Sequence, residues 1–453
     1  MQRGKIFGQA EKLYLYLYLA LLSVIYLLAE DHGTGMAQWA RFDLTKAIVE
    51  GHTFKIDGLI ENTVDWSYYN GHYYAAKAPG ASFWAVPFYY LFWRFSIITD
   101  LWLDNYSVML QFINFFVTII PSVALAYFIY GYAKIREKNS SRRDSGVVLY
   151  TYSLATLAFP FSAILWGHQT AASFLFISFY LMSVRHSFFW SGLLLGAAVL
   201  TDYIVGPAVA FFTVYLLFTL RRDWNNRMRA LVRFALGGLP MFALFAYYNY
   251  ECFDHPLRLA YLYQNPLFSP DLPDRLFGVI AIPDLKILYE LTFGFYRGLF
   301  TTTPIMFLGL IGLITAIIKN QQRPVAVVSL MIFLSVLSTN AGFTIWDAGD
   351  SSGPRYLVPA LPFLAVGLIY VRTNWLFYSL LALSVINVTA IASVTSASNH
   401  IFKNLLFGDI FPNLLHKPER IMNFLTLSAC SLFALFLVQK IQTINQRSSE
   451  GNT

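Results

Sequence analysis

Long apolar runs separated by short polar segments recur along almost the whole chain. A helix that crosses a bilayer needs about 20 mostly apolar residues, so each run of roughly this length predicts one spanning helix. The pattern predicts about a dozen such helices, and the shorter ones must be tilted or extended by flanking residues. The expected spans are 12–29, 107–133, 147–167, 171–186, 188–201, 203–220, 230–248, 301–318, 325–339, 356–371, 374–394 and 421–438.

Basic residues between these runs indicate the direction of the chain. They cluster at 134–143, 221–229, 319–323 and in the C-terminal tail, and basic loops favour the cytoplasmic side of a membrane. With all four clusters in the cytoplasm, the helices alternate without conflict and both termini fall inside. Two long segments, 30–106 and 249–300, then face the outer side.

One aromatic run, 81–95, would reverse this order if it crossed the membrane. We therefore expect it to be re-entrant or to lie along the outer interface, where its Trp84, Tyr89, Tyr90 and Trp93 are typical residues. The alternative is a true span with the basic loop at 134–143 on the outer side.

Composition supports one membrane domain over 1–453, with the outer segments 30–106 and 249–300 as active-site elements and 440–453 as a cytoplasmic tail. Hydrophobic residues make up 57% of the chain and charged residues 13%, about half the usual charged share. The net charge of +7 is spread over the short clusters, which argues against a nucleic-acid surface. Two cysteines, Cys252 and Cys430, are too few for a disulfide framework. We found no P-loop, dinucleotide fingerprint, zinc-protease motif or nucleophile elbow.

The first outer segment carries the densest set of chemical candidates. Residues 36–50 predict a short amphipathic helix with Gln38 and Arg41 on its polar face, and Lys77 precedes a rigid Pro-Gly bend that holds it at the membrane surface. A lysine and an arginine at a lipid interface can clamp a phosphate, and nearby carboxylates can supply a base or hold a metal. The competing interpretation is that Lys77 only extends along the membrane surface to reach water, with ordinary solvated acids around it.

The later outer loops add further candidates. His168 lies in a tight turn, and Asp202 stands at the outer end of a predicted span, where an acid is a functional candidate or simply a helix end wetted by headgroups. Arg297 enters the next span from the outer side. The turn near 345 offers Trp346, Asp347, Asp350 and Arg355 for a sugar or phosphate, or else Arg355 pairs with one of the two acids.

The order of these motifs resembles that of a known family. The motifs are Asp65-Trp66, Gly71-His72-Tyr73-Tyr74, Lys77-Ala78-Pro79-Gly80 and, much later, Gly353-Pro354-Arg355-Tyr356 leading into Pro359-Ala360-Leu361-Pro362. The chain resembles the GT-C membrane glycosyltransferases, in particular bacterial proteins similar to dolichyl-phosphate-mannose protein mannosyltransferases of glycosyltransferase family 39 and the Rgt-type lipopolysaccharide-core transferases. The resemblance covers most of the chain in architecture, while its sharp motifs are confined to 38–80, 294–300 and 346–362.

The resemblance implies an all-α polytopic fold of about 12 transmembrane helices plus one re-entrant or interfacial helix, with an outward-facing active site. It implies a sugar donor carried on a polyprenyl phosphate, whose phosphate lies near Lys77 and Arg41, with Arg297 and Arg355 as further candidates. Gln38 stands where the family has its usual catalytic acid. The base would then be Asp31, Asp65 or Asp43, of which we favour Asp31 at the mouth of the first helix, or the chain has lost transferase chemistry. The expected substrate-binding residues are Gln38, Tyr74, His168, Asp202, Trp346, Asp347 and Asp350.

The predicted activity is therefore transfer of a sugar to a glycan, lipid or protein acceptor on the outer face of a bacterial cytoplasmic membrane. The scheme requires no metal, although the acids are compatible with a divalent ion. A transporter or flippase of a lipid-linked or anionic solute is the rival class, but no internal repeat is evident and the polar residues gather at the outer surface. A non-catalytic relative that binds lipid-linked sugar is the third interpretation, because of Gln38.

Overall fold

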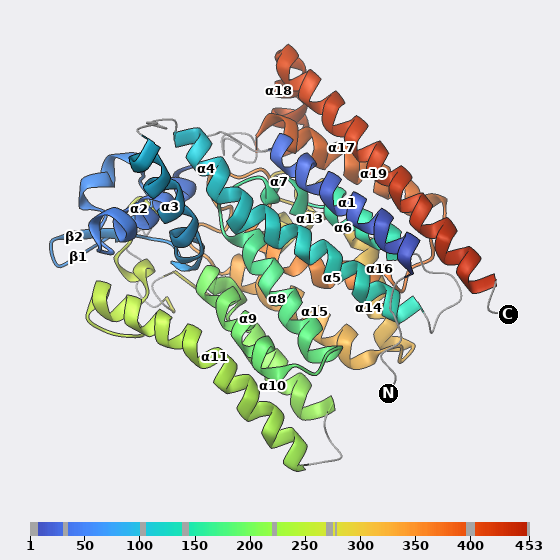
Figure 1. The fold of residues 1–453 in the computed structure, drawn as a ribbon, viewed down its shortest axis with the longest axis horizontal. Helices are drawn as coiled ribbons and strands as arrows, with labels where there is room; N and C mark the ends of the chain where they lie inside the picture. Colours follow the sequence, from blue (N-terminus) through green and yellow to red (C-terminus); the bar gives the residue numbers. More distant parts are fainter. Residues whose placement is uncertain are drawn as a thin grey trace.

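The computed structural model describes residues 8–29, 35–99, 106–137, 145–219, 224–268, 275–276, 279–395 and 404–450. These residues form a helical molecule with one small β-hairpin (Figure 1). The α-helices, in chain order, are Gln9–Leu28 (α1), Met36–Gly51 (α2), Gly80–Thr99 (α3), Tyr106–Asn114 (α4), Ile120–Glu137 (α5), Ser145–Leu154 (α6), Ala158–Ser162 (α7), His168–Ser183 (α8), Phe188–Thr201 (α9), Ala208–Thr219 (α10), Trp224–Phe253 (α11), Leu285–Thr292 (α12), Leu299–Thr302 (α13), Ile305–Ile318 (α14), Arg323–Ala341 (α15), Leu361–Leu368 (α16), Trp375–Val394 (α17), Phe411–His416 (α18) and Pro418–Glu450 (α19).

Shorter elements connect them. The strands Trp66–Tyr69 (β1) and His72–Ala75 (β2) pair antiparallel, with Trp66 opposite Ala75. Single helical turns of tighter or wider pitch are Asp57–Asn62 (η1), Phe115–Ile119 (η2), Tyr203–Val205 (η3), Ala260–Tyr263 (η4), Arg355–Ala360 (η5) and Leu406–Ile410 (η6).

Six helices in the described part of the chain are long and apolar enough to cross a membrane: Gln9–Leu28, Val108–Arg136, Trp224–Phe253, Arg323–Ala341, Trp375–Val394 and Pro418–Gln446. Four shorter apolar segments accompany them: Phe188–Thr201, Tyr203–Thr219, Ile305–Ile318 and Arg355–Leu368. Each predicted span coincides with helical structure, so the expected polytopic, mostly helical class is confirmed. The total of twelve crossings stays a prediction.

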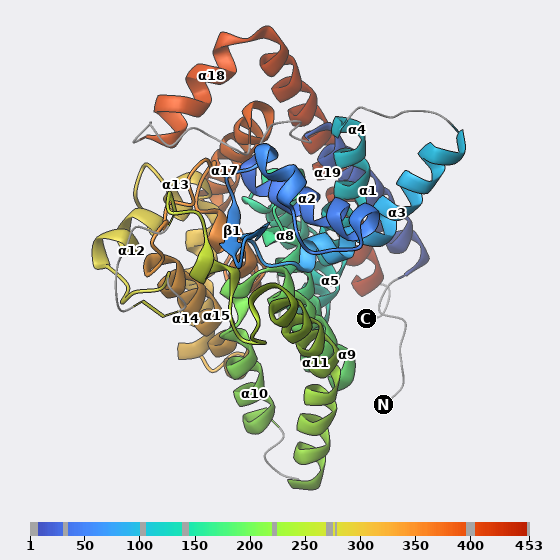
Figure 2. The same cartoon turned by 90° about the vertical axis from the view of Figure 1, so that its left-hand side faces the viewer.

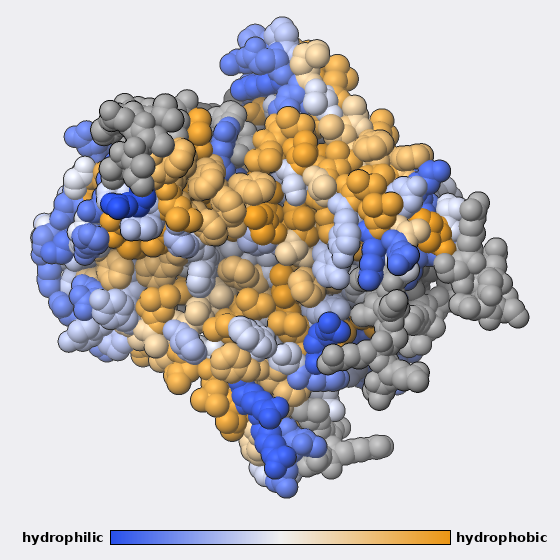
Figure 3. Space-filling view, in the orientation of Figure 1, coloured by the Kyte–Doolittle hydropathy of each residue, from blue (hydrophilic) through white to orange (hydrophobic). Residues whose placement is uncertain are grey.

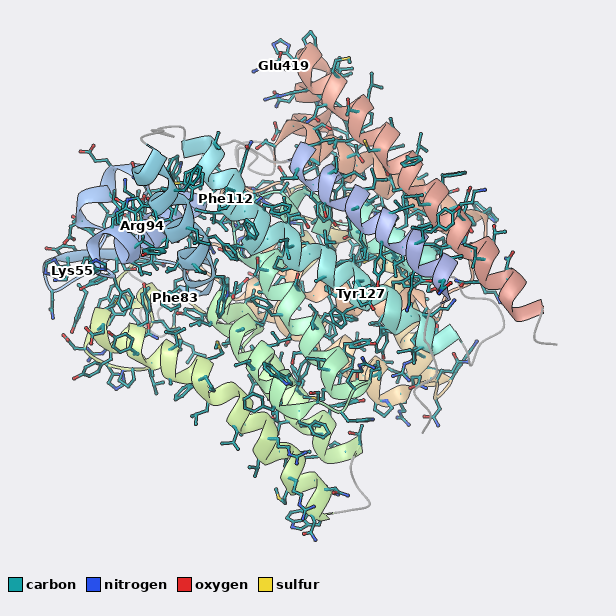
Figure 4. The ribbon with its side chains drawn as sticks, viewed as in Figure 1. Lys55, Phe83, Arg94, Phe112, Tyr127 and Glu419 are labelled. Carbon is teal, nitrogen blue, oxygen red and sulfur yellow. The ribbon has the colours of Figure 1, made fainter. Side chains whose placement is uncertain are left out.

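Hydrophobic and hydrophilic residues occupy different parts of the molecular surface. In Figure 3 a broad hydrophobic band crosses the middle of the molecule, and hydrophilic residues gather over α2 and the hairpin and around the tips of α11 and α19. Lys55 and Arg94 lie at the α2–α3 end in Figure 4, whereas Tyr127 lies along α5 within the band. Such a band is the surface that a lipid bilayer covers.

Close helix packing depends on glycine at one contact. α9 and α11 lie side by side, and a Cβ atom at Gly192 or at Gly237 would collide with a backbone carbonyl oxygen of the facing helix, that of Phe234 or Phe189. Small residues at such contacts let two helix backbones approach each other, which is how helices associate in membranes. This contact fixes the path of α9, whose last turn leads to the site described below.

The aromatic run expected to be re-entrant or interfacial forms most of α3, which packs on α2 at one end of the molecule (Figures 1 and 2). α3 is not one of the six helices that meet the length and hydropathy of a span. Its depth in the bilayer stays a prediction.

Candidate active site

A cavity of about 230 Å³ opens at the end of the molecule that carries α2 and the hairpin. Figure 2 views this end and shows α2 and β1 in front, with α8 behind them. The walls come from the start of α2, the base of the hairpin, the segment before α8, η4 and the loop 343–356. The lining residues are Gly35, Met36, Ala37, Val64, Asp65, Lys77, Trp166, Tyr261, Gln264, Phe268, Val279, Phe343, Thr344, Ile345, Ala348, Gly349, Asp350, Arg355 and Tyr356.

The hairpin places Asp65 and Lys77 opposite each other. Asp65 precedes β1 and Lys77 follows β2, and the pairing continues past the strands because the Ala76 N–H donates to the Asp65 carbonyl at 3.0 Å. The Lys77 Nζ lies 2.8 Å from an Asp65 carboxylate oxygen. The ion pair therefore holds both predicted residues at the cavity wall.

The start of α3 brings this pair to the end of α9. Gly80 lies so close to the Leu200 carbonyl that a Cβ atom there would come within 2.6 Å of its oxygen. The Trp84 indole N–H also donates to the Thr201 hydroxyl at 2.8 Å. Lys77 is consequently packed near Asp202, which follows Thr201.

Two guanidinium groups complete a cationic wall. Arg41 is buried in α2 and donates one N–H to the carbonyl of Ala37 at 2.7 Å, and burial lowers its pKa. The Arg355 guanidinium stacks over the Trp166 ring at 4.4 Å from the ring centre. In each arginine the buried Nε has no hydrogen-bond partner among the described residues. Buried donors without partners are uncommon, and a guanidinium group is a strong donor to an anion such as a phosphate.

His168 and Asp202 form a second polar pair beside these cations. The His168 Nδ1 and an Asp202 carboxylate oxygen are 2.6 Å apart, and both side chains are buried. His168 begins α8, Asp202 ends α9, and the short connection between these two helices brings both residues to the same end. The sequence had predicted both as candidates but not that they contact each other.

Arg297 lies behind the cavity and holds the late loop. Its guanidinium donates to the backbone carbonyls of Asp347, Gly349 and Ser351, and it also contacts the Tyr296 hydroxyl. Burial lowers its pKa. With its donors used in this way, Arg297 is placed as a support of the loop and does not line the cavity.

The remaining predicted residues fall in different places. Asp350 lines the cavity, whereas Asp347 is held by the Tyr296 hydroxyl at 3.1 Å and the Trp346 ring packs edge-on against Tyr296. Tyr74 is buried under the hairpin and lines a separate hollow near the end of α11. Asp31 lies outside the described residues.

A smaller hollow adjoins the main cavity and is lined by Arg41, Lys77, His168, Asp202 and Arg355, among others. Gln38 and Asp43 are both buried on α2 and line neither of the two. Asp43 accepts a hydrogen bond from the Asn62 amide at 3.0 Å, and burial raises the pKa of its carboxyl group to about 7. Of the acids predicted as a base, Asp65 is thus the one that the described structure places at the cavity.

Two important aromatic residues were missed by the sequence interpretation. Trp166 supports Arg355, and Tyr261 lies in the wall of the main cavity and, with Arg41, in that of the smaller hollow beside it. The only available signal for Trp166 was its place directly before the predicted turn at 167–170. No group of three or more His, Cys, Asp or Glu residues in the described ranges could hold a metal ion.

The long apolar helices, the short helix α2 at one end and the cavity between the hairpin region and the loop 343–356 form an architecture that is known from a solved structure. ArnT from Cupriavidus metallidurans, solved with undecaprenyl phosphate bound, has this fold: the two chains superpose with a TM-score of 0.50 and 14% sequence identity, over 97% of this chain and 79% of that chain. No protein-family model matches this chain, and no curated protein sequence matches it. The shared architecture confirms the GT-C-like fold that the sequence motifs predicted.

Proposed function

We propose that this multi-pass membrane protein transfers a sugar from a polyprenyl-phosphate donor to an acceptor hydroxyl on the outer face of the cytoplasmic membrane. The observation that carries the proposal is the cluster of cations: Lys77 and Arg355 line the main cavity, and Arg41 joins them in the wall of the smaller hollow beside it. The buried Nε of each arginine has no hydrogen-bond partner among the described residues. The fold is shared with a protein that was solved with undecaprenyl phosphate bound, which supports the same class of lipid.

The chemistry follows from the charges. When the bond between the anomeric carbon and the phosphate oxygen breaks, negative charge grows on the leaving polyprenyl phosphate. Fixed cations placed at that phosphate stabilise the transition state more than the ground state. A single displacement by the acceptor oxygen inverts the anomeric carbon. The lipid tail would lie among the apolar helices, which is why such a donor needs a membrane enzyme.

Asp65 suits a supporting role in this scheme. Its carboxylate is engaged by Lys77 at 2.8 Å, so it holds the lysine side chain in place before the donor arrives. Arg297 supports the late loop in a similar way through carbonyl groups. Lys77 and the loop that precedes Arg355 are therefore held in position before the donor binds, which reduces the entropy lost on binding.

The test is a transfer assay on purified protein in lipid, with radiolabelled undecaprenyl-phosphate sugars and a membrane glycan extract as acceptor. We expect the wild type to move label and Lys77→Ala to lower the rate by about 10²–10³-fold, the usual effect of removing one stabilising group. Lys286→Ala, at an exposed residue on α12 outside the cavity, is the matched control and should keep the wild-type rate.

Two results would contradict the proposal. Equal rates for Lys77→Ala and wild type would remove the phosphate clamp. Movement of intact labelled donor across the bilayer, with no label on any acceptor, would instead assign the protein to the flippases.

A further inference from the structure

His168 and Asp202 are arranged as a base and its supporting acid. An ionised carboxylate can only accept a hydrogen bond, so the contact of 2.6 Å requires the proton to lie on the His168 Nδ1. The other Asp202 oxygen accepts from the Ile204 N–H at 3.3 Å, which fixes the carboxylate at the end of α9. The Nε2 atom of His168 then carries a free lone pair, and no described residue bonds to it.

The pair lies beside the proposed phosphate site. A hollow of about 20 Å³ adjoins the main cavity, and the two share Lys77, Arg355 and Tyr261 in their walls. His168 and Asp202 line this hollow together with Arg41. About one water-sized probe fits in such a volume, so the hollow matches one hydroxyl group or one water molecule.

We propose that His168 is the general base that activates the acceptor hydroxyl and that Asp202 is its positioning residue. The proposal rests on the transferase activity proposed above and adds the group that is missing at Gln38. It is favoured over Asp43, which lies off the cavity, and over Asp65, which is already engaged by Lys77.

The step balances as a single displacement. His168 Nε2 takes the proton from the acceptor hydroxyl while the acceptor oxygen forms a bond to the anomeric carbon. The bond from that carbon to the phosphate oxygen breaks, and its electron pair leaves with the polyprenyl phosphate beside Lys77, Arg41 and Arg355. The imidazolium is stabilised by Asp202 and afterwards returns its proton to the departing phosphate or to water.

The charge state of His168 suits this role. Burial lowers its pKa from the ordinary 6.5; Arg355 and Arg41 act in the same direction, whereas Asp202 opposes them. Lys77, Tyr261 and Tyr356 also line the hollow, and none of them supplies a negative charge at neutral pH. The imidazole is therefore neutral and able to accept a proton at pH 7.

The experiment measures kcat/KM for the donor against pH, together with kcat at saturating donor, for the wild type, His168→Gln and Asp202→Asn. We expect the wild-type kcat/KM to fall on acidification with a midpoint below 6.5, because protonation of the free protein removes the base. His168→Gln should lose about 10²–10⁴-fold in kcat, the usual contribution of a general base, and should lose this acid limb, with donor KM nearly unchanged.

Asp202→Asn should lower kcat less and move the acid limb to lower pH, because the negative charge that favours the imidazolium is gone. His416→Gln, at an exposed histidine on α18, is the matched control and should behave as wild type. Thermal unfolding in detergent checks that each variant is folded. If His168→Gln does not fold, the acid-limb shift in Asp202→Asn decides the question.

The outcomes separate the two proposals. A wild type that transfers no label at any pH overturns the transferase function and the base with it. A wild type that transfers label, with His168→Gln within threefold of it and the same acid limb, overturns the base alone. Restoration of the rate of a folded His168→Ala variant by added imidazole would support it, because only a proton acceptor has been returned.

Discussion

The three cations of the site are each held by a different interaction. Lys77 is held by the Asp65 carboxylate, Arg41 by a carbonyl of its own helix, and Arg355 by the face of the Trp166 ring. Only the first of these interactions neutralises charge. The contacts that hold the two arginines in place leave their positive charge in the wall. A site for an anionic headgroup needs such a positive potential.

Asp43 gives a pH-dependent prediction at the residue scale. Its carboxyl pKa is raised from 3.8 to about 7 by burial, so the protonated form favours the folded protein. That stabilisation is complete below pH 3.8 and is lost as the pH rises to about 7. Asp43→Asn should therefore raise the unfolding temperature by several degrees at pH 8 and by clearly less at pH 5, where only part of the stabilisation has been lost.

Thermal unfolding in detergent at the two pH values measures the effect. Glu61→Gln, at an exposed residue of the same outer segment, is the control that should show neither change. If the difference in unfolding temperature between Asp43→Asn and wild type were the same at both pH values, the raised pKa of the buried Asp43 carboxyl group would be contradicted.

Sequence patterns identified most residues of the site but not their partners. Lys77, Arg41, Arg355, His168 and Asp202 were all candidates because each is a polar residue at the expected outer surface. Their contacts were not predictable, since Arg355 stacks on the Trp166 ring, almost 190 positions earlier in the chain, and not on one of the two nearby acids. Such contacts depend on how the helices pack against one another, and the spacing of apolar and polar residues in one sequence does not determine that packing.

At the scale of elements, the contact between α9 and α11 controls the position of Asp202. A methyl group at Gly192 would overlap the Phe234 carbonyl, so Gly192→Ala must push the helices apart. We expect a loss of about 1–3 kcal/mol in stability, the usual effect of overpacking, and reduced transfer because the end of α9 moves.

A neighbouring glycine provides a matched comparison. A Cβ atom at Gly238 would meet its nearest neighbour, the Gly192 carbonyl oxygen, at an ordinary 3.6 Å. Gly238→Ala should therefore unfold at close to the wild-type temperature in the same detergent. Equal unfolding temperatures for Gly192→Ala and wild type would show that the helices can separate without loss.

Hydropathy predicted the existence of these helices better than their ends. The run expected at 230–248 is extended to Trp224–Phe253, because the basic residues before it continue the same helix beyond the apolar part. Similarly, the run at 147–167 is divided into α6 and α7. A predicted span is defined by the number of apolar residues in a run. Polar residues that extend a helix, or a break inside the run, do not change that number, so the hydropathy pattern did not show them.

At the scale of the whole molecule, the start of α1 and the end of α19 lie together at the side opposite α2 and the hairpin (Figure 1). The positive-inside rule predicts that this side faces the cytoplasm. In a variant with Cys252 and Cys430 replaced by serine, a cysteine at Glu61 should react with a membrane-impermeant maleimide on intact cells. A cysteine at Gln321, in the exposed turn before α15, should react only after permeabilisation. The reverse pattern would invert the proposed orientation and place the cavity inside the cell.

The carbonyl contacts of Arg297 have a consequence for how related proteins can diverge in sequence. The loop from Asp347 to Ser351 is held through main-chain oxygens, which every amino acid possesses. Many substitutions of its side chains therefore leave the path of the loop unchanged. Under the proposed function, substitutions of loop residues that face the cavity would alter which sugar or acceptor fits, while the arginine keeps the rim of the cavity in the same shape.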